Sequence, residues 1–84
     1  DAENLGHSGA EILQMRVDEK CSWLGDKLMD LDFPGHAVIG AVLKRGRVVT
    51  PGGDTMLTAG DEVVVFALPD AVDEVAEFFA GGAS

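Results

Sequence analysis

The stretch AVIGAVLKRGRVVT, residues 37 to 50, decides the fold of this chain. Its first seven residues are almost continuously apolar and too few for a typical buried helix. They predict a strand that is buried on both faces or lies at an interface. Gly40 inside that run indicates a bend or a close backbone approach. Arg45 and Gly46 then precede a second β-prone run, and a glycine in such a central pair is typical of a tight turn. The stretch therefore predicts a β-hairpin.

Further strands are predicted on both sides of this hairpin. Residues 11 to 17 alternate apolar and polar side chains, which is the period-two pattern of a strand with one buried face. After a turn signal at residues 58 to 61, the β-branched and aromatic run over residues 62 to 68 predicts another strand. Residues 55 to 57 offer a short extra strand.

Residues 22 to 32, SWLGDKLMDLD, have the spacing of a short amphipathic helix. Leu24, Leu28 and Leu31 fall at i, i+4 and i+7, on one helical face. Ser22 is the expected N-cap, and the Phe-Pro-Gly sequence that follows is expected to end the helix.

A second helix is predicted near the C-terminus, with Asp70 as its N-cap and a Gly-Gly pair from Gly81 as its end. Its apolar stripe is expected to consist of Val72, Val75, Ala76 and Phe79. The element order is therefore β-α-β-β-β-α. This order predicts an α+β domain in which helices pack against a mixed or antiparallel sheet.

Length and composition predict one small domain, because a chain of 84 residues buries a single modest core. Residues 1–10 are expected to be a linker, residues 11–80 the folded domain and residues 81–84 a frayed tail. The start at Asp1 without a methionine suggests a piece of a longer protein.

Charge and composition also exclude several function classes. A formal net charge of −9 repels a phosphate backbone, so no nucleic acid is expected as a partner. No apolar run approaches the roughly 20 residues of a spanning helix, so direct membrane insertion is not expected. Cys21 is the single cysteine, which rules out an internal disulfide and fits a reducing, cytoplasmic compartment. No nucleophile and base motif and no calcium-loop spacing is present, so we expect neither an enzyme nor a metal site.

Three features allow a functional and a structural interpretation. Lys44, Arg45 and Arg47 form a basic tip that either binds an anion or keeps an exposed turn solvated, and the second is favoured. His36 is either a pH sensor or an ordinary loop residue, again with the second favoured. Trp23 is expected to pack on the core or a partner rather than to stack on a ligand.

The apolar strand itself predicts a dimer. A small domain has little core with which to cover both faces of so apolar a strand, so a second copy is the simplest cover. The expected interface residues are Val38, Ile39, Gly40, Ala41 and Val42.

Taken together, the segments resemble the C-terminal subdomain of RCK modules, also called the TrkA-C domain. The matching features are the helix-like segment from Gly25 to Asp32, the VIGAV strand, the Arg-Gly hairpin and the Gly-Asp pair before VVVF. The resemblance covers residues 11 to 80. FALPDAV, residues 66 to 72, is most similar to the regulatory subunit of Trk potassium uptake systems.

The resemblance implies a cytosolic homodimer beneath a membrane-embedded potassium transporter or channel, where it turns the binding of a small effector into control of ion transport. The nucleotide-binding Rossmann fold that precedes this subdomain in full modules has a glycine-rich loop that is absent here. NAD or ATP is therefore not expected as a cofactor of this chain.

Some members of the family bind cyclic di-AMP at the dimer interface. Carried over by position, the ligand would contact Leu28, His36, Ala37, Val38 and Pro51. Binding members place a polar amide near the start of the strand, where this chain has Ala37. The alternative is a purely structural dimerisation domain of another ion or carboxylate transporter, without a ligand of its own.

Overall fold

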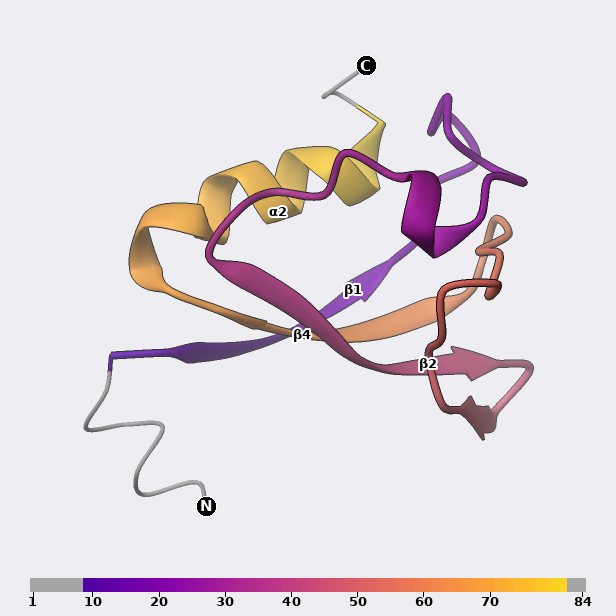
Figure 1. Cartoon of the computed structure of the whole chain (residues 1–84), viewed down its shortest axis with the longest axis horizontal. Helices are drawn as coiled ribbons and strands as arrows, with labels where there is room; N and C mark the ends of the chain where they lie inside the picture. The colour runs from indigo at the N-terminus through magenta and orange to yellow at the C-terminus, as the bar shows by residue number, and fades with distance from the viewer. Residues whose placement is uncertain (1–8, 82–84) are drawn as a thin grey trace.

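Four antiparallel strands form a single sheet, and one helix packs across one of its faces (Figure 1). This architecture comes from a computed structural model that describes residues 9–81. Most of the predicted linker 1–10 and tail 81–84, namely residues 1–8 and 82–84, lies outside the described residues. The elements are β1 (Glu11–Arg16), β2 (Ala37–Lys44), β3 (Arg47–Val49), β4 (Glu62–Ala67) and α2 (Val72–Ala80).

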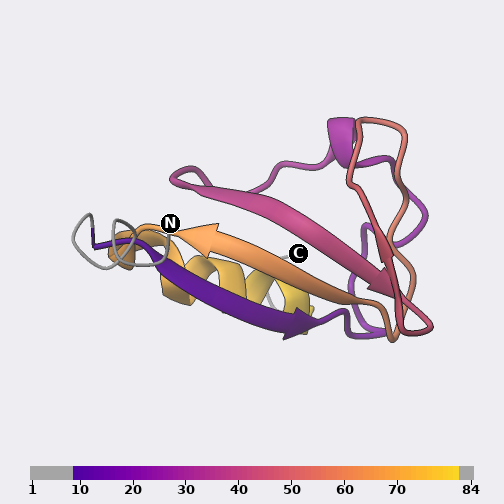
Figure 2. The same cartoon turned by 90° about the horizontal axis from the view of Figure 1, so that it is seen from below.

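The strands lie in the order β1-β4-β2-β3, so β4 and β2 are the two inner strands (Figure 2). The predicted strands and the α+β class are confirmed, and every strand pair is antiparallel. Val63, Val65 and Ala67 of β4 are buried on the face that α2 covers, and they alternate with more exposed neighbours on the other face. This inner face, together with α2, holds the core.

The hairpin between β2 and β3 has the predicted form. Lys44 pairs with Arg47, and the two residues between them, Arg45 and Gly46, both have positive φ (53° and 79°). Positive φ at both central positions defines a type I′ turn, whose twist matches that of the flanking strands. The predicted hairpin is confirmed.

Gly40 marks an irregularity in β2, as the sequence predicts. The register with β4 shifts between Ile39 and Ala41. A Cβ atom at Gly40 would stand 2.2 Å from Cε2 of Phe66, because that ring lies over the glycine. Gly40 is therefore required because the Phe66 ring of the same protomer packs closely against its backbone.

The C-terminal helix ends as predicted but begins differently. Gly81 caps it with φ of 82°, the left-handed conformation that glycine adopts without strain. Asp70 is not its N-cap, because Asp70 lies in a preceding 3₁₀ turn and its carboxylate contacts the imidazole of His36. Ala76, which was predicted to belong to the buried stripe, is exposed. Phe78, which was not predicted to belong to it, is buried.

The helix predicted over residues 22–32 is wrong. Only a 3₁₀ turn forms, Leu28–Asp30, and Ser22 caps no helix. Gly25 has φ of 88°, which breaks a right-handed helix. The N–H groups of Leu28 and Met29 donate to the carbonyls of Thr55 (2.8 Å) and Gly53 (3.1 Å), so they form no helical ladder.

The leucines of this segment nevertheless pack against the core, as their spacing predicts. The short extra strand expected at residues 55–57 is reduced to one isolated bridge between Lys27 and Met56. Segment and loop thus hold each other in place through backbone hydrogen bonds without regular secondary structure.

An aromatic cluster connects this segment to α2. Trp23 stacks on Phe78 with ring centroids 4.8 Å apart, and its indole N–H donates to the Phe78 carbonyl (3.3 Å). Phe33 and Phe79 complete the cluster with edge-to-face contacts. The packing role predicted for Trp23 is confirmed.

Candidate functional site

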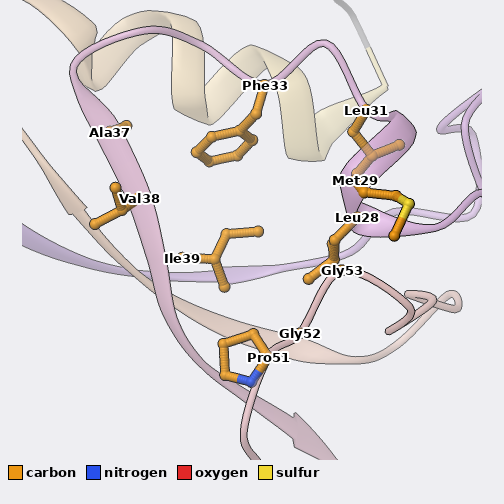
Figure 3. A pocket seen from close by; sticks show the side chains of 10 residues that line it. All are labelled: Leu28, Met29, Leu31, Phe33, Ala37, Val38, Ile39, Pro51, Gly52 and Gly53. Carbon is orange, nitrogen blue, oxygen red and sulfur yellow. The ribbon is translucent and has the colours of Figure 1, made fainter.

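A groove of about 410 Å³ lies between the start of β2, the 3₁₀ turn and the loop after β3 (Figure 3). Figure 3 shows Phe33 and Leu28 reaching into it from the loop side, opposite Ala37 and Ile39 of β2. None of the lining side chains carries a charge. The lining residues are Leu28, Met29, Leu31, Phe33, Ala37, Val38, Ile39, Pro51, Gly52 and Gly53.

The structure brings together four of the five residues that the family resemblance assigns to ligand contact. Leu28, Ala37, Val38 and Pro51 all line the groove. His36 does not, because its left-handed backbone (φ 64°) turns its side chain toward Asp70, outside the groove. Their binding role stays a prediction, but their placement defines one candidate site.

Sequence reasoning missed half of the lining. Met29 and Leu31 lie in the segment predicted to be a helix, and Phe33 lies in the Phe-Pro-Gly sequence that was expected to end it. Gly52 and Gly53 line the groove through backbone, and a Cβ atom at Gly53 would stand 2.8 Å from Cε of Met29. The Gly-Gly pair directly after Pro51 was the available signal, because two glycines in a loop permit a close approach.

The predicted interface strand is not buried on both faces. Val38 is 61 % exposed on the face of the sheet away from α2, and Gly40 is also exposed. Val42 is fully buried in the core of its own chain, so its side chain is not available to a second copy. Ile39 lines the groove, and Ala41 is half-buried.

Among residues 9–81, no strand pairs with the outer edge of the first half of β2. The carbonyl of His36 accepts a hydrogen bond from the N–H of Leu68 (2.9 Å), one residue before the paired Ala37 and Ala67. Because hydrogen-bonded and non-bonded pairs alternate in an antiparallel ladder, Val38 bonds β4 while the N–H and C=O groups of Ala37 and Ile39 point away from it. Within the described chain, β3 pairs with β2 only from Val42 onward.

The basic tip of the hairpin is partly neutralised. The Lys44 ammonium donates to the buried carboxylate of Asp61, which also accepts from the N–H (2.9 Å) and hydroxyl (3.2 Å) of Thr58. Burial opposes ionisation, but the hydrogen bonds and charge of Lys44 and the Thr58 hydrogen bonds outweigh it and lower the pKa of Asp61. Lys44 is thus engaged in the fold, which supports the structural interpretation of this tip.

One histidine–carboxylate contact and one exposed ion pair lie near the groove. His36 Nδ1 lies 3.0 Å from a carboxylate oxygen of Asp70, and Lys27 Nζ lies 3.7 Å from one of Asp54. Lys27 and Asp54 directly flank the lining residues Leu28 and Gly53 in sequence. Lys27 is therefore the cation placed next to the groove wall.

The single cysteine has the surroundings of a core residue. Cys21 is buried, and its thiol donates to the carbonyl of Phe79 (3.3 Å). Burial is the main cause that raises the pKa of this thiol. A thiol held protonated in this way is a weak nucleophile.

Residues 9–81 contain no cluster of three histidine, cysteine or acidic side chains that could hold a metal ion. Nor does this described part of the chain include a helix that is long and apolar enough to cross a membrane.

Residues 12–80 match the TrkA-C domain family. The chain is 36 % identical over 72 residues to a Trk system potassium uptake protein TrkA homolog of Pyrococcus horikoshii, which covers 84 % of this chain and 32 % of that protein. It is 38 % identical over 76 residues to the Trk system potassium uptake protein TrkA of Azorhizobium caulinodans, covering 90 % of this chain and 17 % of that protein. The chain thus spans a third or less of the length of these relatives.

Two solved structures share the fold. One is an RCK domain with cda, with a TM-score of 0.71 and 22 % identity over 81 % of this chain and 96 % of that one. The other is the RCK_C domain dimer of S. agalactiae BusR in complex with c-di-AMP, with a TM-score of 0.70 and 19 % identity. It covers 89 % of this chain and 95 % of that chain.

Proposed function

This chain belongs to the TrkA-C domain family, and we propose that it is a cytosolic regulatory domain that dimerises and controls a membrane-embedded potassium transporter. The effector in this proposal is cyclic di-AMP, which the groove beside β2 binds. The relatives of this chain are longer proteins. In this proposal, the parts of such a protein outside this domain convert ligand binding into a gating signal. A regulatory role needs no catalytic residues.

The observation that carries the proposal is the convergence of Leu28, Ala37, Val38 and Pro51 on one groove. Its volume of about 410 Å³ is in the range of small-molecule sites. Apolar walls suit the faces of a purine base, and the free N–H and C=O groups of Ala37 and Ile39 suit its polar edge. Apolar surface with a few fixed polar groups is the usual composition of a ligand site.

One observation favours the second candidate, a structural dimerisation domain without a ligand. No charged side chain lines the groove, although cyclic di-AMP carries two phosphates. The nearest cation in sequence, Lys27, is paired with Asp54. With a net charge of −9, the chain as a whole repels an anion.

Isothermal titration calorimetry of the purified chain with cyclic di-AMP tests the proposal, after light scattering has established its mass. We expect saturable heat at about one nucleotide per two chains, because a two-fold symmetric ligand fits a two-fold symmetric dimer. Pro51→Ala should weaken binding by about tenfold through lost apolar contact. His36→Asn is the matched control, because His36 lies outside the groove and asparagine tolerates its left-handed backbone.

A flat titration on a folded dimer would contradict the ligand and leave the structural candidate. Loss of binding in His36→Asn, with Pro51→Ala unaffected, would place the ligand in the shallow pocket formed with Asp70 and Glu74 instead.

A further inference from the structure

We propose that Lys27 binds a phosphate group of the ligand in the groove, and that Asp54 competes for the same ammonium group as an internal counter-ion. This inference rests on the proposed function, because it names the cation that holds an anionic ligand there. A cation is needed at this place, because the groove walls carry no charge and the chain as a whole repels an anion.

Lys27 and Asp54 lie at the border of the groove. Leu28 directly follows Lys27 and Gly53 directly precedes Asp54, and both of these neighbours line the groove. Figure 3 shows Leu28 and Gly53 next to each other, where the 3₁₀ turn meets the loop after β3. The Lys27 ammonium therefore lies close to the space that a ligand would fill.

The backbone, rather than the ion pair, holds Asp54 beside Lys27. The N–H of Thr55 donates to the carbonyl of Gly52 (3.1 Å), and the N–H of Gly52 donates to the Thr55 hydroxyl (3.0 Å), which closes a turn around Asp54. The carbonyls on either side of Asp54 accept hydrogen bonds (3.1 and 2.8 Å) from the first two residues after Lys27. The carboxylate thus keeps its place when the ion pair opens.

The ion pair itself is weak. Lys27 Nζ lies 3.7 Å from the nearest Asp54 oxygen, which is longer than a hydrogen bond, and the two side chains are 51 % and 85 % exposed. Ion pairs with this exposure contribute little to stability. Lys44 differs, because it donates to the buried carboxylate of Asp61. Lys44 is engaged in the fold, whereas Lys27 can exchange its partner.

The exchange leaves no buried charge unpaired. The flexible four-carbon stem of Lys27 lets the ammonium group turn from the carboxylate to a phosphate oxygen. Asp54 then stays in water, because its side chain is exposed with or without its partner. Its fixed negative charge still attracts the ammonium and repels the phosphate. Asp54 therefore lowers the affinity of the groove for an anion.

Calorimetric titration of cyclic di-AMP into variants of the full chain tests this competition, because its two members should change affinity in opposite directions. Lys27→Gln should weaken binding about tenfold through loss of a charge-assisted hydrogen bond, and Lys27→Arg should retain it. Asp54→Asn should strengthen binding about threefold. A purely structural ion pair would give losses for both. The pair is exposed, so none of these changes should unfold the chain.

Two variants control for net charge alone. Lys20→Gln and Asp73→Asn change the net charge by the same amounts as Lys27→Gln and Asp54→Asn. Both residues are exposed and neither lines the groove. Their affinities should stay close to that of the unmodified chain.

Salt dependence and a double variant give independent measurements. The tenfold difference between the unmodified chain and Lys27→Gln should shrink between about 50 mM and about 500 mM NaCl, because salt screens an exposed contact. Asp54→Asn should lose most of its gain when Lys27→Gln is also present, because the counter-ion acts mainly through that ammonium group.

The outcomes separate this inference from the proposed function. Saturable binding that Lys27→Gln weakens no more than Lys20→Gln, or that Asp54→Asn strengthens no more than Asp73→Asn, overturns the counter-ion competition and leaves the regulatory site intact. Binding by Asp54→Asn alone supports the competition and contradicts an effector role in the unmodified chain. Flat titrations of both the unmodified chain and Asp54→Asn at about 1 mM nucleotide overturn both.

Discussion

Residues 22–32 and 70–80 have similar apolar spacing, yet only the second segment forms an α-helix. In both, leucine, valine or phenylalanine side chains recur every three or four residues and pack on the core. The spacing therefore predicts which side chains are buried. It does not determine whether the backbone between them is helical.

The backbone explains the difference. The glycine of the second segment, Gly81, comes at its end and caps the helix, whereas Gly25 lies inside the first segment in a left-handed conformation. The N–H groups of Leu28 and Met29 also find carbonyl partners in the loop of residues 53–57. A segment that satisfies its backbone through a neighbouring loop gains nothing from a helical ladder.

Phe79→Ala should have the largest effect on stability and would show that the helical region is the rigid one. Phe79 is fully buried and contacts Trp23 and Phe33, so its truncation leaves a cavity. We expect a loss of about 4 kcal/mol in the free energy of unfolding, measured by urea denaturation. Leu28→Ala, at a half-buried groove position, should cost only about 1 to 2 kcal/mol. Equal losses would mean that both regions are packed equally tightly.

Much of the fold could be predicted from the sequence, because strands and turns here depend on local patterns. The alternation in residues 11–17, the Arg45-Gly46 turn and the capping Gly81 each act within a few residues. The missing helix, by contrast, depends on contacts with residues 53–57, which lie more than twenty positions away in sequence. No local pattern reveals those contacts, although Gly25 inside the segment is a local signal against a helix.

The candidate site could be predicted only in part, because its walls come from segments that are distant in sequence. Leu28 and Pro51 were assigned through family resemblance, and their meeting in one groove depends on the loop pairing. Phe33 was expected only as part of a helix-ending turn, yet it joins both the aromatic cluster and the groove wall. The free edge of β2 follows from the short length of β3, and the sequence does not reveal where its pairing with β2 stops.

Asp61→Asn should have an intermediate effect, because Asp61 fastens the loop before β4 to the hairpin through Lys44. A neutral amide keeps the shape but loses charge-assisted hydrogen bonds, so we expect a loss of about 2 kcal/mol at pH 7. The pKa of Asp61 is lowered in the folded state, so its ionised form contributes stability above the ordinary carboxyl pKa of about 4. That contribution is lost as pH falls through the lowered pKa of the folded state.

Chemical denaturation between pH 7 and pH 2 measures this dependence. The stability difference between the unmodified chain and Asp61→Asn should be constant near neutrality and shrink below about pH 4. Asp54→Asn, at an exposed carboxylate paired with Lys27, is the control and should show little difference at any pH. A difference for Asp61→Asn that does not change with pH would rule out the charge of Asp61 as its cause.

Gly25→Ala and Gly81→Ala should have the smallest effects on stability. They compare residues 22–32 directly with the end of α2. Both Gly25 and Gly81 have positive φ, so alanine at either position should cost about 1 kcal/mol in backbone strain. At Gly81 the new Cβ would also stand 2.9 Å from Cβ of Lys20 and 3.0 Å from its backbone carbon, whereas at Gly25 nothing lies within 4 Å. Thermal unfolding should therefore show a larger loss for Gly81→Ala than for Gly25→Ala. The reverse order would mean that residues 22–32, rather than the end of α2, are the more constrained region. Tight packing, instead of hydrogen bonds to residues 53–57, would then explain why residues 22–32 form no helix.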